Sequence, residues 1–266
     1  MRIGFQARLF GPERNLSAEV DFALAAGFRA IQFRGSPSAM VGNLGDLTAA
    51  DSLLRDSKIE PVLEILIGLD EHGLCEGRSP TGILRDNLPL INSLRIRYVH
   101  WHLYTLIEQA LPTVTQSLAD QCATAVELGN SHGFRMAIEN NSPEGLVLVR
   151  PSHCRELLEA VPGLGLVWDL NHSEPGDAVH FLELATSMQM LHVSDTPLPE
   201  ANHHLPLGLG TVPISRHMEI LRRAGYNGPM ILEVGGHASS GGHGRDTDTA
   251  LQDSRSRLEA AWIGGA

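Results

Sequence analysis

Short apolar runs alternate along the chain with longer amphipathic stretches. The runs span four to seven residues and are bounded by Gly, Pro or polar residues, as is typical of buried parallel strands. They lie at residues 3–7, 30–33, 61–67, 97–102, 135–139, 164–169, 190–194 and 230–234. Helical periodicity lies near residues 17–26, 46–57, 81–94, 113–131, 151–160, 177–187, 213–224 and 247–262. The pattern predicts eight consecutive strand–helix units.

This alternation places the chain in the α/β class, with parallel strands and right-handed crossovers. Eight units in 266 residues, about 33 residues each, predict a (β/α)8 TIM barrel that forms a single domain over residues 1–266. An open doubly wound sheet is the alternative. It is disfavoured because no G-x-G-x-x-G motif follows an early strand and no G-x-x-x-x-G-K-[ST] motif occurs.

Composition narrows the classes of partner. Hydrophobic residues make up 42% of the chain, enough for a large core, and the net charge is −11. This acidic balance makes nucleic acid or an anionic membrane an unfavourable partner. No apolar run of about 20 residues predicts a membrane helix. Three cysteines without a C-x-x-C motif, and no signal-peptide pattern, predict a cytoplasmic protein.

The last four predicted strands end in residues that bind metals. These residues are Glu139, Asp169, His192 and Glu233. In a barrel the carboxyl ends of the strands meet at one face, so four such ends can converge on one point. Three carboxylates and an imidazole suit one divalent ion, with Mn²⁺, Mg²⁺, Co²⁺ or Zn²⁺ as candidates. A strand-end Glu taken alone is more often a loop anchor or an arginine partner, so the succession of four carries the prediction.

Strand alternation supports the same interpretation. If the four candidate ligands face inward, Ala137, Val167 and Ile231 do so too, and a barrel interior prefers such small or branched residues. Without a cation the three carboxylates would repel one another, and some would stay protonated. His172, three residues after Asp169, either joins the site or caps its own turn.

Several motifs resemble one family. They are I-E-N-N from residue 138, W-D-L-N-H from 168, L-H-V-S-D from 191, H-H-L-P-L-G-L-G from 203 and A-G-Y-N-G-P-M-I-L-E from 224. These runs resemble the xylose isomerase-like TIM barrel superfamily. It includes sugar phosphate isomerases and epimerases, inosose dehydratases, hydroxypyruvate isomerase and AP endonucleases of the endonuclease IV type. The resemblance covers residues 135–234 well and the first half of the chain by pattern only.

The resemblance implies a function. Glu139, Asp169, His192 and Glu233 would hold the metal, while His172 and His204 would meet the substrate. The substrate would be a small sugar, sugar phosphate or related hydroxy-carbonyl compound, isomerised or epimerised through an enediolate. Glu139 and Glu233 would form the acid/base pair. Because His192 must be neutral to bind a metal, activity should fall below about pH 6.

Some positions depart from the family pattern and leave the substrate open. The second predicted strand ends in Gln32-Phe33-Arg34, where many relatives have Glu, and Leu209 replaces the usual acidic residue. Residues 196–199, Thr-Pro-Leu-Pro, stand where some ketose epimerases carry a basic residue. Arg34 is expected either to meet an anionic group of the substrate or to form a salt bridge at the rim.

Two further segments are candidates for binding. His100 and His102 share a face of the fourth predicted strand, where either could bind substrate or a second ion, or simply be hydrogen bonded at the rim. The glycine-rich segment 235–244 could wrap a phosphate with its backbone N–H groups, although a flexible loop is the better expectation.

Three rival functions remain. An endonuclease IV-like zinc-dependent DNA repair phosphodiesterase would share the four ligands, but Asn202 stands where that branch has Asp, and the basic surface of a DNA binder is missing. A dehydratase of the inosose type would use the same metal chemistry, and a barrel of the third kind would bind a sugar or metal without turnover. Relatives often form dimers or tetramers, so a homo-oligomer is plausible.

Overall fold

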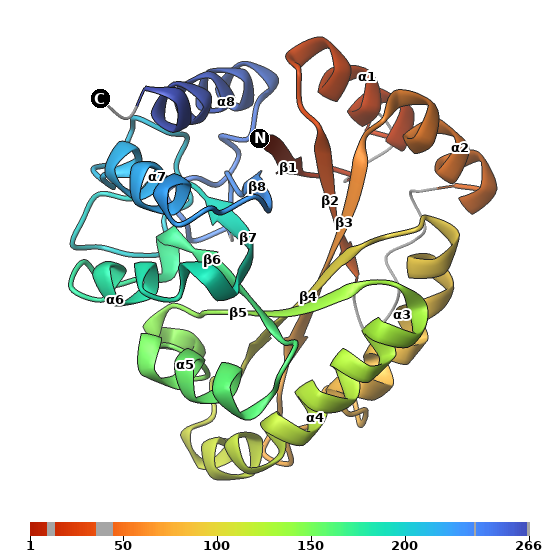
Figure 1. The fold of residues 1–266 in the computed structure, drawn as a ribbon, viewed down its shortest axis with the longest axis vertical. Helices are drawn as coiled ribbons and strands as arrows, with labels where there is room; N and C mark the ends of the chain where they lie inside the picture. The colour runs from red at the N-terminus through yellow and green to blue at the C-terminus, as the bar shows by residue number, and fades with distance from the viewer. Residues whose placement is uncertain (10–13, 36–44, 237, 265–266) are drawn as a thin grey trace.

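Eight parallel strands close into a barrel, with the helices arranged around it (Figure 1). The computed structural model describes residues 1–9, 14–35, 45–236 and 238–264. Each strand pairs with its neighbour in sequence, and β8 pairs with β1. The strands are β1 (Arg2–Gln6), β2 (Ala30–Gly35), β3 (Glu60–Gly68), β4 (Tyr98–Tyr104), β5 (Arg135–Glu139), β6 (Gly165–Asp169), β7 (Met188–Val193) and β8 (Pro229–Leu232). The predicted TIM barrel is therefore confirmed.

The helices begin and end at residues with clear capping roles. Asn15 caps the first helix through its side chain, and Gly27 ends it in the left-handed conformation. The helices are α1 (Leu16–Ala26), α2 (Leu47–Ser57), α3 (Pro80–Ser93), α4 (Leu111–His132), α5 (Pro151–Ala160), α6 (Ala178–Leu182), α7 (Ile214–Arg223) and α8 (Asp248–Ile263). Among the described residues, none of these helices is long and apolar enough to cross a membrane.

One predicted helix is wrong in extent. The periodicity predicts a helix near residues 177–187, but α6 ends at Leu182 and a separate 3₁₀ turn covers Ala185–Ser187. The backbone N–H of Leu184 bonds to the carbonyl of Phe181, so the chain tightens into a three-residue repeat before β7. The predicted strands, in contrast, match the observed ones to within two residues at each end.

Side chains from the strands form two apolar layers. Outward-facing residues pack against the helices in a large core. Inward-facing residues form a smaller cluster that fills the barrel axis, and we call it the inner plug. Its members are Ala30, Val62, Ala137, Val167, Met190 and Ile231. The predicted inward orientation of Ala137, Val167 and Ile231 is thus confirmed, and the plug forms a floor beneath the carboxyl ends of the strands.

Gly4 of β1 faces the inner plug and has no room for a side chain. A Cβ atom added there would lie 2.6 Å from the carbonyl oxygen of Ala30 and 2.8 Å from Cδ1 of Ile231. The backbones of β1 and β2 can approach this closely only because the residue is glycine. Gly176, in contrast, lies in the turn before α6 and has open space where a Cβ would be.

His217 of α7 packs against the outer face of the barrel, on Trp168 of β6. Its ring centroid lies 5.3 Å from that of Trp168, and the residue is only 6% exposed. Nδ1 of His217 has no hydrogen-bond partner among the described residues. Burial, with a smaller contribution from Arg216, lowers the pKa of His217 to about 4.

Gly4→Ala should lower the free energy of unfolding by about 1–3 kcal/mol, because the methyl group overpacks the plug and forces the backbone apart. Gly176→Ala is the matched control and should change stability by less than about 0.5 kcal/mol. Urea unfolding monitored by circular dichroism measures both. Equal effects of the two substitutions would contradict the close packing at Gly4.

His217 should make the fold less stable in acid. Its pKa is about 4 in the folded protein and about 6.5 when unfolded. Between these values the unfolded chain binds more protons, so stability falls as pH drops, by at most about 1.4 kcal/mol per pH unit. His217→Gln should reduce this pH dependence of unfolding, whereas His153→Gln, at an exposed position of α5, should retain it. An unchanged slope in His217→Gln would show that this side chain does not contribute.

Candidate metal centre

The four residues predicted to bind metal lie together at the carboxyl ends of neighbouring strands. Glu139 and Asp169 are the last residues of β5 and β6, His192 lies in β7, and Glu233 directly follows β8. One ligand atom from each lies within 4.8 Å of those of the others. Three of the side chains are fully buried and Glu233 is 5% exposed. We call this group the carboxylate cluster.

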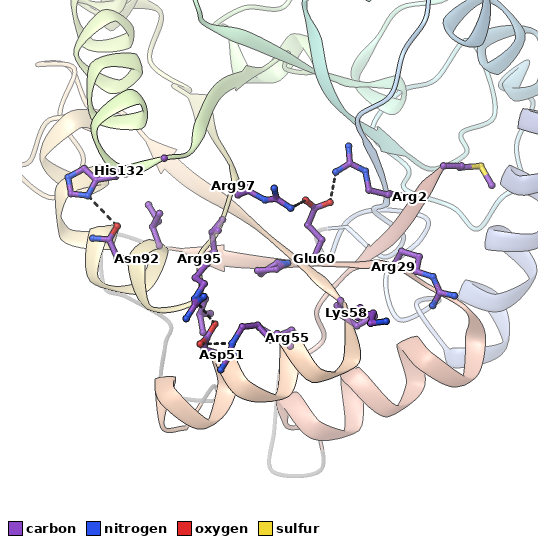
Figure 2. A pocket seen from close by; sticks show the side chains of 18 residues that line it. Arg2, Arg29, Asp51, Arg55, Lys58, Glu60, Asn92, Arg95, Arg97 and His132 are labelled. Atoms are coloured by element: carbon purple, nitrogen blue, oxygen red, sulfur yellow. Dashed lines mark hydrogen bonds and ion pairs between the residues drawn. The ribbon is translucent and has the colours of Figure 1, made fainter.

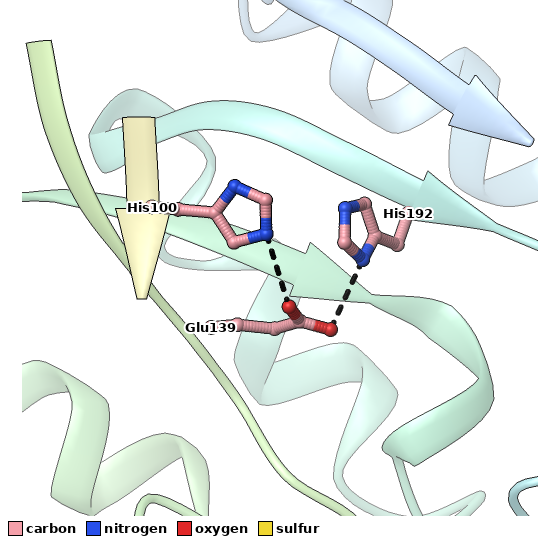
Figure 3. A group of neighbouring side chains, drawn as sticks. All are labelled: His100, Glu139 and His192. Atoms are coloured by element: carbon pink, nitrogen blue, oxygen red, sulfur yellow. Dashed lines mark hydrogen bonds and ion pairs between the residues drawn. The ribbon is translucent and has the colours of Figure 1, made fainter. Parts of the chain in front are cut away.

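His192 lies at the centre of the carboxylate cluster. Its Nδ1 is 3.0 Å from Oε1 of Glu139 and 3.0 Å from Oε2 of Glu233. Figure 3 shows the Glu139 side chain between His192 and His100, and Nε2 of His100 is 3.3 Å from its Oε2. Burial alone would lower the pKa of His192, but Glu139 and Glu233 outweigh it and raise that pKa well above its usual value. The two carboxylates therefore favour the charged form of His192 when no cation lies between them.

A hydrogen-bonded chain behind His192 fixes its orientation. Nε2 of His192 donates to Oε1 of Gln32 at 2.9 Å, and the amide nitrogen of Gln32 donates to Glu64 at 3.3 Å. Because Gln32 accepts the Nε2 proton, a neutral His192 keeps its lone pair on Nδ1, the atom that faces the carboxylates. Such a partner behind a ligating histidine is common in metal sites. Gln32, which departs from the family pattern, thus has a role in orienting His192.

Glu64 is a functional candidate that the sequence pattern did not reveal. It is fully buried in β3, and its carboxylate accepts hydrogen bonds from Gln6 and Arg34. Burial would raise its pKa, yet Arg34 and His102 hold it below the ordinary value for Glu. A single acidic residue inside the apolar run at residues 61–67 was the available signal, because a charge there must face either a partner or a site.

His102 lies between two carboxylates at the edge of the cluster. Its Nδ1 is 3.5 Å from Oε1 of Glu64 and 3.5 Å from Oε2 of Glu139. Burial lowers the pKa of His102, but these two carboxylates raise it to about 9. His100, two residues earlier in β4, is fully buried rather than at the rim, and its ring nitrogens have no hydrogen-bond partner among the described residues. Burial lowers its pKa despite the contact with Glu139. The pKa values of the two histidines of β4 are therefore shifted in opposite directions.

His172 and His204 continue the row of histidines from His102 past Asp169. Nδ1 of His172 is 3.1 Å from Oδ2 of Asp169 and 3.0 Å from the carbonyl oxygen of Asn140. The rings of His172 and His204 meet edge to face at 5.4 Å. His204 is tied to the cluster because its Nδ1 lies 3.0 Å from the carbonyl oxygen of Glu233. Asp169, His172 and His204 form a second group with metal-ligand spacing.

Arg34 forms the salt bridge that was one of its two predicted roles. Its Nε is 3.2 Å from Oε2 of Glu64, and its terminal nitrogen is 3.6 Å from Oε1 of Glu233. About a third of the side chain, 35%, remains exposed. The guanidinium therefore spans Glu64 and Glu233 and keeps one side open to solvent. A contact with substrate remains a prediction.

The glycine-rich segment 235–244 packs on the loop that carries His204. The backbone N–H of Gly235 donates to the carbonyl of His204, and that of Gly242 donates to the carbonyl of His203. These N–H groups are thus already bonded within the protein. His237 lies outside the described residues. A role for this segment in binding phosphate remains a prediction.

The carboxylate cluster has the properties of a cation site. Buried oxygens of Glu139, Asp169 and Glu233 have no hydrogen bond of good geometry among the described residues. Burial raises the pKa of Asp169 to about 7, and the charges of Glu233 and Glu139 add to this rise. Adjacent ligand atoms about 2.0–2.2 Å from one ion lie about 3.0–3.6 Å apart, so the 3.0 Å spacing around His192 fits. The donor set of carboxylates and imidazole suits a divalent ion.

Solved structures with the same fold include an L-ribulose 3-epimerase, with a TM-score of 0.77, 15% identity, and coverage of 99% of this chain and 95% of that one. The IOLI protein with a bound zinc atom has a TM-score of 0.77, 16% identity, and coverage of 100% and 99%. The probable 3-DHS dehydratase AsbF from Bacillus anthracis has a TM-score of 0.71, 16% identity, and coverage of 97% and 99%. No curated protein matches the chain by sequence.

At these identities the solved structures establish the fold alone. The family model described as xylose isomerase-like TIM barrel matches residues 20–261, nearly the whole chain. This match, together with the closed barrel and the group of buried Glu, Asp and His residues at its carboxyl ends, agrees with the resemblance found in the sequence motifs. The chain belongs to the xylose isomerase-like TIM barrel family.

Proposed function

We propose that the protein is a divalent-metal-dependent isomerase or epimerase of a small sugar, sugar phosphate or related hydroxy-carbonyl compound. The observation that carries this proposal is the placement of Glu139 and Glu233. Both carboxylates lie 3.0 Å from Nδ1 of His192, in one buried cluster with Asp169. Two carboxylates around one cation site suit chemistry in which a proton leaves one position of a substrate and returns at another.

The residues of the carboxylate cluster would have two roles, metal binding and proton transfer. Glu139, Asp169, His192 and Glu233 would hold the ion, which when bound supplies Lewis acidity to a hydroxy-carbonyl group. One of the two glutamates removes the α proton, and the other returns a proton to the opposite face or to the next carbon. The enediolate between these steps is planar at the reacting carbons, so either face can accept the proton.

The surrounding cations and histidines would bind the substrate. Arg34, 35% exposed, carries the charge that is best placed for an anionic or hydroxyl group of a substrate. His102, His172 and His204 line the same edge of the carboxylate cluster, with their rings 5.4 Å apart from one to the next. Structural neighbours that are named as epimerases of small sugars support this substrate class.

Metal binding should stabilise the fold. Protein stripped with EDTA should unfold at a lower temperature, and one of Mn²⁺, Mg²⁺, Co²⁺ or Zn²⁺ should restore the loss, by about 2.7 kcal/mol at 100 times its Kd. Glu139→Ala should remove the effect, whereas Glu159→Ala, at an exposed position of α5, should keep it. Elemental analysis should find about one ion per chain. If none of the four ions stabilises the wild-type protein, the metal site is refuted.

Turnover should exchange substrate protons with solvent. Ketoses incubated with the metal-loaded protein in D₂O should gain deuterium at the carbon next to the carbonyl, as followed by NMR. Glu233→Gln should slow this exchange by about 100-fold or more, because the proton carrier is lost. The control is Glu159→Gln, which removes a carboxylate at an exposed position of α5. This variant should exchange at the wild-type rate. Loss of water instead of exchange would identify a dehydratase, and cleavage of abasic DNA would identify a nuclease.

A further inference from the structure

A cleft lies at the opposite end of the barrel from the carboxylate cluster. It has a volume of about 900 Å³ and lies between the starts of β1–β4 and the carboxyl ends of α2, α3 and α4 (Figure 2). Its cationic lining residues are Arg2, Arg29, Arg55, Lys58, Arg95 and Arg97. We call it the basic cleft. Its volume is within the range of pockets that bind small molecules.

The basic cleft concentrates positive charge on an acidic protein. The chain has a net charge of −11 and 20 Lys and Arg residues in all. Six of these 20 line the basic cleft, together with only two carboxylates, those of Asp51 and Glu60. Lys58 is the single lysine of the sequence. The side chains of this one cleft therefore carry a formal charge of +4, from six positive and two negative groups.

The two carboxylates cannot neutralise these cations. Asp51 is shared by Arg55 and Arg95, whose nitrogens lie 3.0 and 3.5 Å from its oxygens. Glu60 is shared in the same way by Arg2 at 2.7 Å and Arg97 at 3.7 Å. Within the described part of the chain, neither Arg29 nor Lys58 has a carboxylate in ion-pair range. Figure 2 shows both as separate side chains beside the Arg2–Glu60 pair.

Helix capping accounts for only part of this arrangement. Cations at helix carboxyl ends offset the helix dipole, and this explains Arg55 in the last turn of α2. Arg2, Arg29 and Arg97 instead stand at or just before the starts of strands, outside the last turn of any helix, so capping does not account for them.

Two of the cations occupy backbone positions where glycine is the usual residue. Lys58 and Arg95 adopt left-handed conformations, with φ of 56° and 52°. Glycine is the usual residue at such positions because a side chain adds strain. A cation at both positions accepts that strain and directs a positive charge toward the same cleft.

Apolar residues beneath the cations strengthen their field. Leu54, Ile59, Ile91, Leu94 and Ile96 line the cleft, and each is 5% exposed or less. Charges above a low-dielectric surface are screened less than charges surrounded by water. An anion in the cleft would therefore be held more strongly than one at an ordinary exposed arginine.

We propose that the basic cleft binds a small metabolite that carries at least two phosphate groups. Two groups are required because the cations form two sets, one around Asp51 and one around Glu60. Guanidinium groups bind phosphate through paired hydrogen bonds, and a phosphate group carries more negative charge than a carboxylate, which suits a cleft with a formal charge of +4. This site is separate from the carboxylate cluster and does not depend on the proposed reaction.

The first test is calorimetric titration of the wild-type protein with inorganic tripolyphosphate, in EDTA and at low ionic strength. Arg29→Gln/Lys58→Gln removes the two cations that have no carboxylate partner and leaves every ion pair of the cleft intact. It should weaken binding by about tenfold or more, as expected for loss of charged hydrogen-bond donors. Arg222→Gln/Arg223→Gln removes two exposed cations of α7 and should bind within twofold of wild type.

Two outcomes would overturn the proposal. One is the absence of tripolyphosphate binding to the wild-type protein, and the other is equal weakening in the two double variants, which would indicate attraction by overall charge.

A second readout uses Lys58, the single lysine in the sequence. Tripolyphosphate should slow the acylation of its amine by an amine-reactive reagent, as mapped by peptide mass spectrometry. Acylation at an unchanged rate would also contradict the proposal.

Discussion

Repulsion between buried carboxylates is the constraint around which the mouth of the barrel is organised. Glu139, Asp169 and Glu233 cannot all be charged in a buried site unless cations lie among them. Bound protons relieve this repulsion, because the pKa of His192, which lies between two of them, is raised well above its usual value, and burial raises the pKa of Asp169 to about 7. A divalent ion can replace these protons. The arrangement that is unfavourable for the carboxylates alone is therefore the one that favours a metal.

The sequence predicted the barrel and the four clustered side chains because both depend on strand periodicity. Each of Glu139, Asp169 and Glu233 ends a short apolar run, and strand alternation requires Ala137, Val167 and Ile231 to share their faces. Parallel pairing in a closed sheet then brings the strand ends together, independently of the conformation of the loops. The metal role of these residues follows from chemistry rather than periodicity, so it remains a proposal.

Contacts across the barrel could not be predicted in this way. Gln32 of β2 departs from the family pattern, yet it orients His192 of β7, five strands later in the sequence. Glu64 lies within an apolar run, and periodicity alone does not show that an acidic side chain there has a partner such as Arg34. Such pairs depend on the position of each side chain along the barrel axis. That position is fixed by the stagger of all eight strands together.

The inner plug has a consequence for communication within the molecule. Ala30, Val62, Ala137, Val167, Met190 and Ile231 close the barrel axis. Side chains therefore fill the axis between the two ends, so a ligand at one end cannot reach the other along it. Any coupling between the ends must be carried by the strands and helices that connect them. Since a strand cannot slip by one residue without turning its side chains to the wrong face, the strands resist such coupling.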